Sequence, residues 1–484
     1  MHSNMKKLLA VLLAALMLIP LVSCSTANDS EDSLAHESQT EALSDAETEF
    51  FPPIEKKDYD GATFQIITPF TKPGDWYYAE EYQSTQSKTS ILNNTLYEMN
   101  TLVEEHLNVE FALKTITFKT GNELFNEVFP TIMAGDDAYQ FCAMDAYYDN
   151  TNFITKNCAL DLYQLEAVDF DQFYWDKSVT EMLTINGKAY LGLGDLCKKL
   201  FYVIYCNKNM LTNANRKMPY DEVRNGQWTL DRLAAISTEL YQDDGDGLRN
   251  SGDIYGFSSS WDCNGAAFLQ ASNIFVATRT DDGNFELSMY GDRLIEMYDK
   301  LYAWSQNESV NLWNVHSPMI TSDFKTEQTY FMTAGLGTDY LDVEFDVGIL
   351  PLPKFDVEQE NYAHVNWGNN MLVPSSIQNK EMVGEVIELM CFYSGTMVLN
   401  KYYDEVLQLR VSDAPDDRDM VELIYDTVVY DPGIAFCDGN GALWDLVYTT
   451  CFGIRNKNPN IASYYQSRYR SANKWLSNMV KKVK

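Results

Sequence analysis

Hydrophobic residues recur along the chain with two alternating periods, and these periods predict an ordered series of strands and helices. Residues 63–68 alternate and then become wholly apolar, which is typical of a strand. Residues 91–107 instead place their apolar side chains three or four positions apart, on one face of a helix. A strand at 109–113, a helix over 124–132 and a strand at 139–144 follow. This order predicts βαβ units and a largely parallel sheet.

The same pattern returns in the second half of the chain. Residues 201–205 and 346–350 predict strands, and residues 228–240 predict a helix with Thr229 as its N-cap. From Ile461 onwards the spacing predicts an amphipathic C-terminal helix with a basic end. A length of 484 residues is more than one ordinary domain needs, so we expect two α/β lobes.

The N-terminal residues have the pattern of an export signal. Two lysines precede an apolar run at residues 8–22, which is shorter than the roughly 20 residues that a membrane span needs. The sequence Leu21-Val22-Ser23-Cys24 resembles the lipobox of bacterial lipoproteins, and this resemblance implies cleavage after residue 23 and lipidation of Cys24. We therefore expect residues 1–23 to be a lipoprotein signal peptide. A plain secretory signal with an incidental cysteine is the alternative.

Acidic residues greatly outnumber basic ones, and this excess limits the kinds of molecule that the protein can bind. Lys and Arg number 36 against 70 Asp and Glu, which gives a formal net charge of −34 and argues against nucleic acid as a partner. Residues 25–49 contain eight acidic residues and neither Lys nor Arg, so we expect 24–57 to form an acidic flexible tether. Lipid on Cys24 would then hold the protein at the extracellular face of the cell membrane.

Cysteine and histidine spacing argues against a metal enzyme or a redox enzyme. Eight cysteines follow Cys24, and no two of them have the CxxC spacing of zinc or thioredoxin-like sites. The whole chain has five histidines, which leaves little material for a catalytic histidine network. We assign no catalytic residue and expect no required cofactor.

Several short segments carry a family resemblance through their order along the chain. They have the sequences AGDDAY, LTINGKAY, YCNK, GQWTLD, YGF and FDVGILPLP, at residues 134–139, 183–190, 205–208, 226–231, 255–257 and 345–353. Together, behind a lipobox, they resemble the extracellular solute-binding proteins of carbohydrate ABC importers, the maltose-binding-protein-like receptors. Nearly the whole mature chain takes part in this resemblance.

The resemblance implies an α/β, two-lobed periplasmic-binding-protein-like fold with hinge strands and a ligand cleft between the lobes. By analogy, residues 58–185 and 352–394 form the N-terminal lobe, and residues 186–351 and 395–484 form the C-terminal lobe. The implied function is that of a lipid-anchored, monomeric receptor that captures a sugar or oligosaccharide for the permease subunits of an ABC importer. Such a receptor closes around its ligand by hinge motion and carries out no catalysis.

A sugar site needs aromatic rings for the sugar faces and carboxylates or amides for the hydroxyls. In α/β folds ligands collect just after the strand ends, so aromatic and acidic residues in such positions are candidates. For each of them ordinary packing or a solvated carboxylate is the alternative, and Trp228, at the start of a helix, is assigned to packing. The expected ligand-binding residues are Trp76, Asp145, Tyr147, Asp195, Trp261, Asp262, Asp339, Trp367, Asn369 and Trp444.

Residues 242–253 resemble a twelve-position calcium loop. Carboxylate and amide oxygens at alternating positions suit Ca²⁺, and Gly247 falls where the loop must turn sharply. The match departs from the usual pattern at both ends, where Gln replaces the first Asp and Asp replaces the final Glu. An Asp/Gly turn without metal is the alternative to a structural calcium ion. The expected metal ligands are Gln242, Asp244, Asp246, Leu248 through its carbonyl, Asn250 and Asp253.

Two other functions remain open from the sequence. A secreted glycoside hydrolase could hide its pair of carboxylates among the 70 acidic residues, because their separation is spatial and not sequential. A receptor for a peptide or another solute could use the same fold, since a fold does not determine its ligand.

Overall fold

The computed structural model describes residues 51–70, 82, 91–117, 121–197, 199–260, 263–313, 323–336, 343–401, 415–439 and 441–483. The signal peptide, Cys24 and most of the predicted tether lie outside these residues. The folded unit is Pro53–Lys484.

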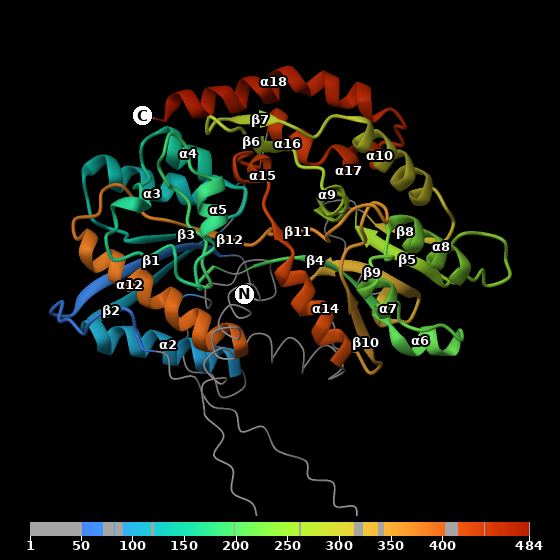
Figure 1. Cartoon of the computed structure of the whole chain (residues 1–484), viewed down its shortest axis with the longest axis horizontal. Helices are drawn as coiled ribbons and strands as arrows, with labels where there is room; N and C mark the ends of the chain where they lie inside the picture. Colours follow the sequence, from blue (N-terminus) through green and yellow to red (C-terminus); the bar gives the residue numbers. More distant parts are fainter. Residues whose placement is uncertain are drawn as a thin grey trace, which may run out of the picture. The chain divides into compact units, whose positions relative to one another are not determined.

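The first sheet has four strands in the order β12-β3-β1-β2 (Figure 1). β1 pairs in parallel with β2 and β3, and β12 is antiparallel to β3. Alternation along β1 gives the sheet two apolar faces: Phe64 and Ile66 enter one core, and Ile67 enters the other. The bounds are β1 (Ala62–Phe70), β2 (Val109–Thr117), β3 (Phe141–Asp145) and β12 (Asn369–Leu372).

Five strands form the second sheet, in the order β10-β4-β9-β5-β8. β4 is antiparallel to both of its neighbours, whereas β5 is parallel to both β8 and β9. Two short pairs, β11 with β13 and β6 with β7, lie outside the two main sheets. The bounds are β4 (Tyr202–Asn207), β5 (Tyr255–Ser260), β8 (Val310–Trp313), β9 (Thr329–Gly335), β10 (Val347–Leu350), β6 (Ala277–Arg279), β7 (Phe285–Leu287), β11 (His364–Val365) and β13 (Val428–Val429).

Helices cover both sheets, and α2 and α12 lie side by side on one face of the first sheet while α3 lies on the other (Figure 1). In order along the chain, the helices are α2 (Ile91–Leu107), α3 (Glu123–Ala134), α4 (Asn150–Thr155), α5 (Lys177–Met182), α6 (Lys208–Asn213), α7 (Tyr220–Arg224), α8 (Leu230–Leu240), α9 (Cys263–Ala271), α10 (Asp292–Ser305), α12 (Lys380–Tyr393), α14 (Pro415–Asp426), α15 (Pro432–Ala435), α16 (Gly441–Val447), α17 (Thr449–Arg455) and α18 (Ile461–Lys482). A short 3-10 helix spans Leu162–Gln164, and a π-helical turn, Ser394–Val398, continues α12.

α12 is a core helix. Within the described residues one helix, Lys380–Lys401, is long and apolar enough to cross a membrane by length and composition. However, 72% of its most apolar window is buried inside the protein. Its buried Glu388 accepts hydrogen bonds from the Tyr174 hydroxyl at 2.6 Å and the Trp175 indole at 2.9 Å. The length and composition of this helix are therefore explained by its place in the core.

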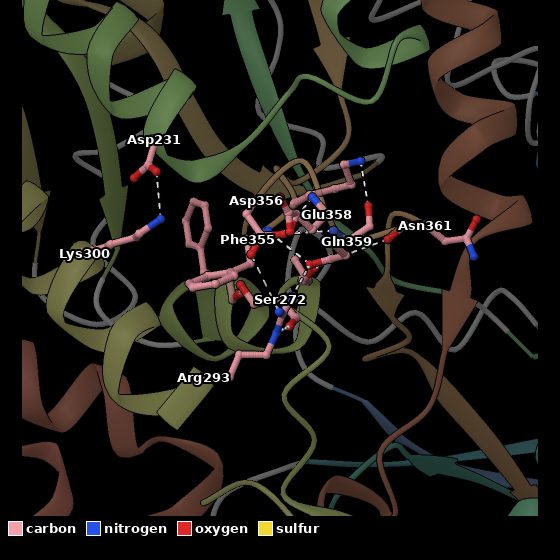
Figure 2. A network of polar contacts seen from close by, with 12 residues as sticks. Asp231, Ser272, Arg293, Lys300, Phe355, Asp356, Glu358, Gln359 and Asn361 are labelled. Carbon is pink, nitrogen blue, oxygen red and sulfur yellow. Dashed lines mark hydrogen bonds and ion pairs between the residues drawn. The ribbon is translucent and has the colours of Figure 1, made fainter. Parts of the chain in front are cut away.

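The segment between β10 and β11 is held by a polar network centred on the buried side chain of Gln359 (Figure 2). Its amide oxygen accepts hydrogen bonds from Arg293 Nη2 at 2.9 Å and from the backbone N–H of Phe355 at 3.1 Å. Lys354 donates to the Gln359 carbonyl at 2.7 Å. Arg293 and Lys300, both on α10, lie 4.5 and 4.6 Å from the centre of the Phe355 ring. The network therefore ties this connection firmly to α10.

The predicted elements are found close to their expected bounds. The helix predicted at 91–107 is α2, and the strand predicted at 109–113 continues as β2 to Thr117. Thr229 Oγ1 accepts the Arg232 N–H at 3.3 Å, which confirms the predicted N-cap of α8. The expectation of a largely parallel sheet holds for the first sheet, whereas the second sheet is mixed.

The backbone hydrogen bonding shows where the chain leaves the first sheet and enters the second. The chain still pairs with the first sheet at Gly192, which bridges to Met371, and it enters the second sheet at Tyr202. The first sheet then gains its last strand from Asn369–Leu372, so it combines distant parts of the chain. The exact lobe boundaries proposed from the sequence stay a prediction.

Replacing Trp228 by Ala should lower the free energy of unfolding by about 3–5 kcal/mol. Its side chain is fully buried, and its indole N–H donates to the Pro351 carbonyl at 2.9 Å. Urea denaturation of the purified protein measures the loss. Tyr163→Ala, at a ring 48% exposed, is the control and should cost far less. Equal losses in the two variants would contradict a packing role for Trp228.

Candidate functional site

A buried carboxylate organises the turn that follows β3. Asp145, the last residue of β3, is 4% exposed, and its Oδ1 accepts the Tyr147 N–H at 2.9 Å. The backbone N–H of Tyr148 is also hydrogen-bonded to this carboxylate. Burial raises the pKa of Asp145 to about 8, although both hydrogen bonds oppose the rise. Asp145 therefore holds the turn that presents the rings of Tyr147 and Tyr148.

Five aromatic rings meet at this turn, and we call them the aromatic cluster: Tyr147, Tyr148, Trp367, Trp444 and Tyr448. Ring centres lie 5.8 Å apart for Tyr147 and Trp367, and 5.3 Å apart for Tyr147 and Trp444. Tyr448 lies 4.2 Å from Trp444 and 6.2 Å from Trp367. The rings come from three places along the chain: the turn after β3, the residues before β12, and the α16–α17 region.

Two buried hydrogen-bond donors lie in the stretch around Trp367. The Trp367 indole N–H and the side-chain amide nitrogen of Asn370 have no hydrogen-bond partner among the residues that the structure describes. Buried donors are rarely left unpaired in folded proteins, so these two are suited to acceptors supplied from outside the chain. Asn366 instead has a structural role, because its side-chain oxygen accepts hydrogen bonds from the backbone N–H groups of Leu200 and Gly368.

The structure places five of the ten ligand residues predicted from the sequence around the end of β3, three of them in the aromatic cluster and two in the strand pairing beside it. Tyr147, Trp367 and Trp444 belong to the aromatic cluster. Asn369 pairs with Asp145 in the ladder of β12 and β3, and it donates its side-chain amide to the Tyr82 hydroxyl at 3.1 Å. Asp145 lies beside the cluster, where it supports the turn.

Asp195 is placed in a different group of charges. Lys199 Nζ lies 3.5 Å from the Asp195 carboxylate and 3.0 Å from that of Asp176. The Tyr430 hydroxyl donates to Asp176 at 3.3 Å. Burial raises the pKa of Asp195 to about 6, against the lowering effect of Lys199. This arrangement gives Asp195 an ion-pair partner within the protein. Trp76, Trp261, Asp262 and Asp339 lie outside the described residues, so their predicted roles stay predictions.

Sequence reasoning missed Tyr148 and Tyr448. Tyr448 lies four residues after Trp444, a spacing that places two side chains on one helical face and could have identified it. Tyr148 follows Tyr147 in the turn after β3, so the strand-end criterion could have identified it, whereas its packing against the distant Gly121 and Gly439 had no sequence signal.

The predicted calcium loop is closed at its two ends. Gln242 and Ile254 exchange backbone hydrogen bonds of 3.0 and 2.9 Å. The exposed carboxylates of Asp243, Asp244 and Asp246 have oxygens within 4.8 Å of one another. Asp243 was not among the predicted ligands, because the assumed register placed it at a position without a ligand role.

The other predicted ligands of this loop already have hydrogen-bond partners within the protein. The Asp253 carboxylate accepts the backbone N–H groups of Asp244 and Asn250, each at 3.2 Å. The Asn250 side chain donates to Asp246 at 2.8 Å and to the Leu248 carbonyl at 2.9 Å. The Gln242 side chain donates to the Tyr330 hydroxyl at 2.8 Å. Calcium binding by the loop stays a prediction.

No protein-family model and no curated protein matches the chain. Solved structures match it over most of its length. The cyclic alpha-maltosyl-1,6-maltose binding protein from Arthrobacter globiformis has a TM-score of 0.58 and 11% identity, with 86% of this chain and 99% of that chain covered. The fold is that of an ABC-transporter solute-binding protein.

Two further solute-binding structures share this fold. The GacH receptor of Streptomyces glaucescens, studied with acarbose, has a TM-score of 0.57 and 14% identity and covers 86% of this chain and 99% of its own. An ABC substrate-binding protein from Listeria monocytogenes in complex with cycloalternan has a TM-score of 0.53 and 15% identity, with coverages of 87% and 99%. At these identities the likeness concerns the solute-binding fold, and it agrees with the two-lobed α/β architecture expected from the sequence.

The raised pKa of Asp145 predicts a pH-dependent stability. The folded protein holds this proton more tightly than the unfolded chain, so the free energy of unfolding falls as pH rises from about 4 towards 8. Asp145→Asn removes the titration. Between pH 5 and 7.5 the wild type should lose at least about 1.4 kcal/mol relative to the variant, which is the equivalent of one pKa unit.

Urea denaturation at several pH values measures this difference. Asp221→Asn, at a side chain 93% exposed, is the control and should follow the wild type. Parallel stability profiles for wild type and Asp145→Asn would contradict a protonated, buried Asp145.

Proposed function

We propose that the protein is an extracytoplasmic receptor that captures a neutral oligosaccharide for an ABC importer. The observation that carries the proposal is the aromatic cluster, together with two buried donors, Trp367 Nε1 and Asn370 Nδ2, that have no hydrogen-bond partner within the described part of the chain. Aromatic faces suit the weakly apolar faces of sugar rings, and unpaired donors suit sugar oxygens.

The position of the cluster supports the same proposal. It follows the carboxyl end of β3, where ligands of α/β folds collect. Three proteins with this fold bind or were studied with a saccharide or a related compound: cyclic alpha-maltosyl-1,6-maltose, acarbose and cycloalternan. A receptor needs no covalent step, and micromolar affinity, about −8 kcal/mol, suffices for capture. We therefore favour a receptor over a glycoside hydrolase.

We further propose that the receptor is lipid-anchored through Cys24 at the extracellular face of the cell membrane and delivers its ligand as a monomer to permease subunits. The lipobox and the acidic residues 25–49 support this. Two or three acyl chains would give stable anchoring, whereas a single chain gives marginal binding. The negative net charge would keep the folded domain away from an anionic surface.

The receptor function is tested by thermal shift and calorimetry of residues 53–484 against neutral mono- and oligosaccharides. A saccharide that binds the folded state raises the unfolding midpoint by mass action. Trp367→Ala and Trp444→Ala should each weaken binding about tenfold or more, because each removes a ring of the cluster. Trp475→Phe, on the half-exposed ring of α18, is the control and should bind as the wild type does.

The alternatives predict different results in the same experiment. Midpoints unchanged by every saccharide, with a shift from a peptide or another solute, would identify a different receptor. Consumption of the bound saccharide would identify an enzyme.

We also propose that the loop at residues 242–253 binds calcium as a structural ion. The clustered carboxylates of Asp243, Asp244 and Asp246 support this, since Ca²⁺ prefers oxygen ligands. EDTA should lower the unfolding midpoint, and added Ca²⁺ should restore it. Asp246→Asn should abolish that response, and Asp221→Asn should preserve it. An identical midpoint with EDTA and with Ca²⁺ would contradict a calcium site.

A further inference from the structure

The ring of Tyr148 lies between two glycines from distant parts of the chain. Gly121 precedes α3, and Gly439 precedes α16. A Cβ atom added to either glycine would overlap the Tyr148 ring. Both glycines also have positive φ angles, 92° and 62°, which side-chain-bearing residues rarely adopt. The space that the ring occupies therefore exists because both positions lack a side chain.

The Gly439 side of this clamp is fixed to the elements that follow β3. The Thr151 N–H donates to the Asp438 carboxylate at 3.0 Å, and the Asn150 side chain donates to the Ala435 carbonyl at 3.0 Å. Asp438, Asn150 and Thr151 are all buried. These contacts hold the loop before α16 against the start of α4, and the half-buried Tyr148 ring lies against Gly439 of that loop.

The Tyr148 ring in turn packs on two other rings of the aromatic cluster. Its centre lies 4.6 Å from that of Tyr147 and 6.1 Å from that of Trp444. Trp444 is on α16, which begins two residues after Gly439. The clamp therefore lies directly before α16 and places the Tyr148 ring beside Trp444.

We propose that Tyr148 is a positioning residue of the ligand site: clamped by Gly121 and Gly439, its ring sets the place of Trp444 and Tyr147. The role in ligand affinity rests on the proposed receptor function. The placement of Trp444 does not rest on it and can be measured without any ligand.

The ligand-free test uses ¹⁹F NMR of protein labelled with 5-fluorotryptophan. The Trp444 resonance is identified by its loss in Trp444→Phe. Tyr148→Ala should shift or split this resonance, and Tyr148→Phe, which keeps the ring, should leave it in place. Tyr148→Leu serves as the second variant should the alanine variant fail to fold. An unmoved Trp444 resonance in the variants without the ring would overturn the proposal.

The ligand test measures Kd by calorimetry with maltotetraose, cellotetraose and xylotetraose. Tyr148→Ala should raise the Kd of the bound saccharide at least about tenfold, or 1.4 kcal/mol, and Tyr148→Phe should restore it. Tyr174→Ala is the matched control, because Tyr174 is a buried tyrosine that packs on Phe392 and contacts no ring of the cluster.

The outcomes separate this proposal from the proposed function. Equal affinity in wild type and Tyr148→Ala would overturn the positioning role alone. Equal losses in Tyr148→Ala and Tyr174→Ala would assign the effect to stability and overturn it too. A loss in Tyr148→Phe would assign the effect to the hydroxyl. If the wild type binds none of the three saccharides, the receptor proposal loses its support, and the Trp444 resonance still decides the positioning role.

Discussion

The buried carboxylate of Asp145 is the interaction on which the candidate site depends. At the end of β3 it accepts hydrogen bonds from the backbone N–H groups of Tyr147 and Tyr148, and these bonds hold the turn that carries the two tyrosine rings. Burying a carboxyl group is costly unless it is hydrogen-bonded or neutral, and this one is bonded and has a raised pKa. The turn that carries the tyrosine rings of the site therefore depends on one carboxyl group, that of Asp145, which is buried in the protein.

This turn matters because the rings around it come from distant parts of the chain. Trp367 lies just before β12, a strand of the first sheet that follows all strands of the second sheet along the chain. Trp444 lies on α16. The crossing topology brings these segments to the end of β3, and Gly121 and Gly439 make room for Tyr148 between them. The aromatic cluster therefore combines rings from three separate segments of the chain, and its geometry depends on how those segments pack together.

Local sequence patterns predicted the helices and strands. They could not predict contacts between residues that are distant in the sequence. The N-cap Thr229 and the left-handed Gly135 after α3 depend on neighbours in sequence, so both could be expected. Tyr147, Trp367 and Trp444 were expected singly from strand ends and turns, but their meeting was not derivable from spacing. The clamp of Tyr148 and the ion pair of Lys199 with Asp176 could not be predicted from spacing, because the first joins residues over 290 positions apart and the second joins two different connecting segments.

A crystal structure of the protein grown with a neutral tetrasaccharide tests the central claim most directly. The account predicts a sugar ring against Trp444 and a sugar oxygen within hydrogen-bond distance of Trp367 Nε1. A saccharide bound elsewhere, with the aromatic cluster packed only on its own side chains, would contradict it.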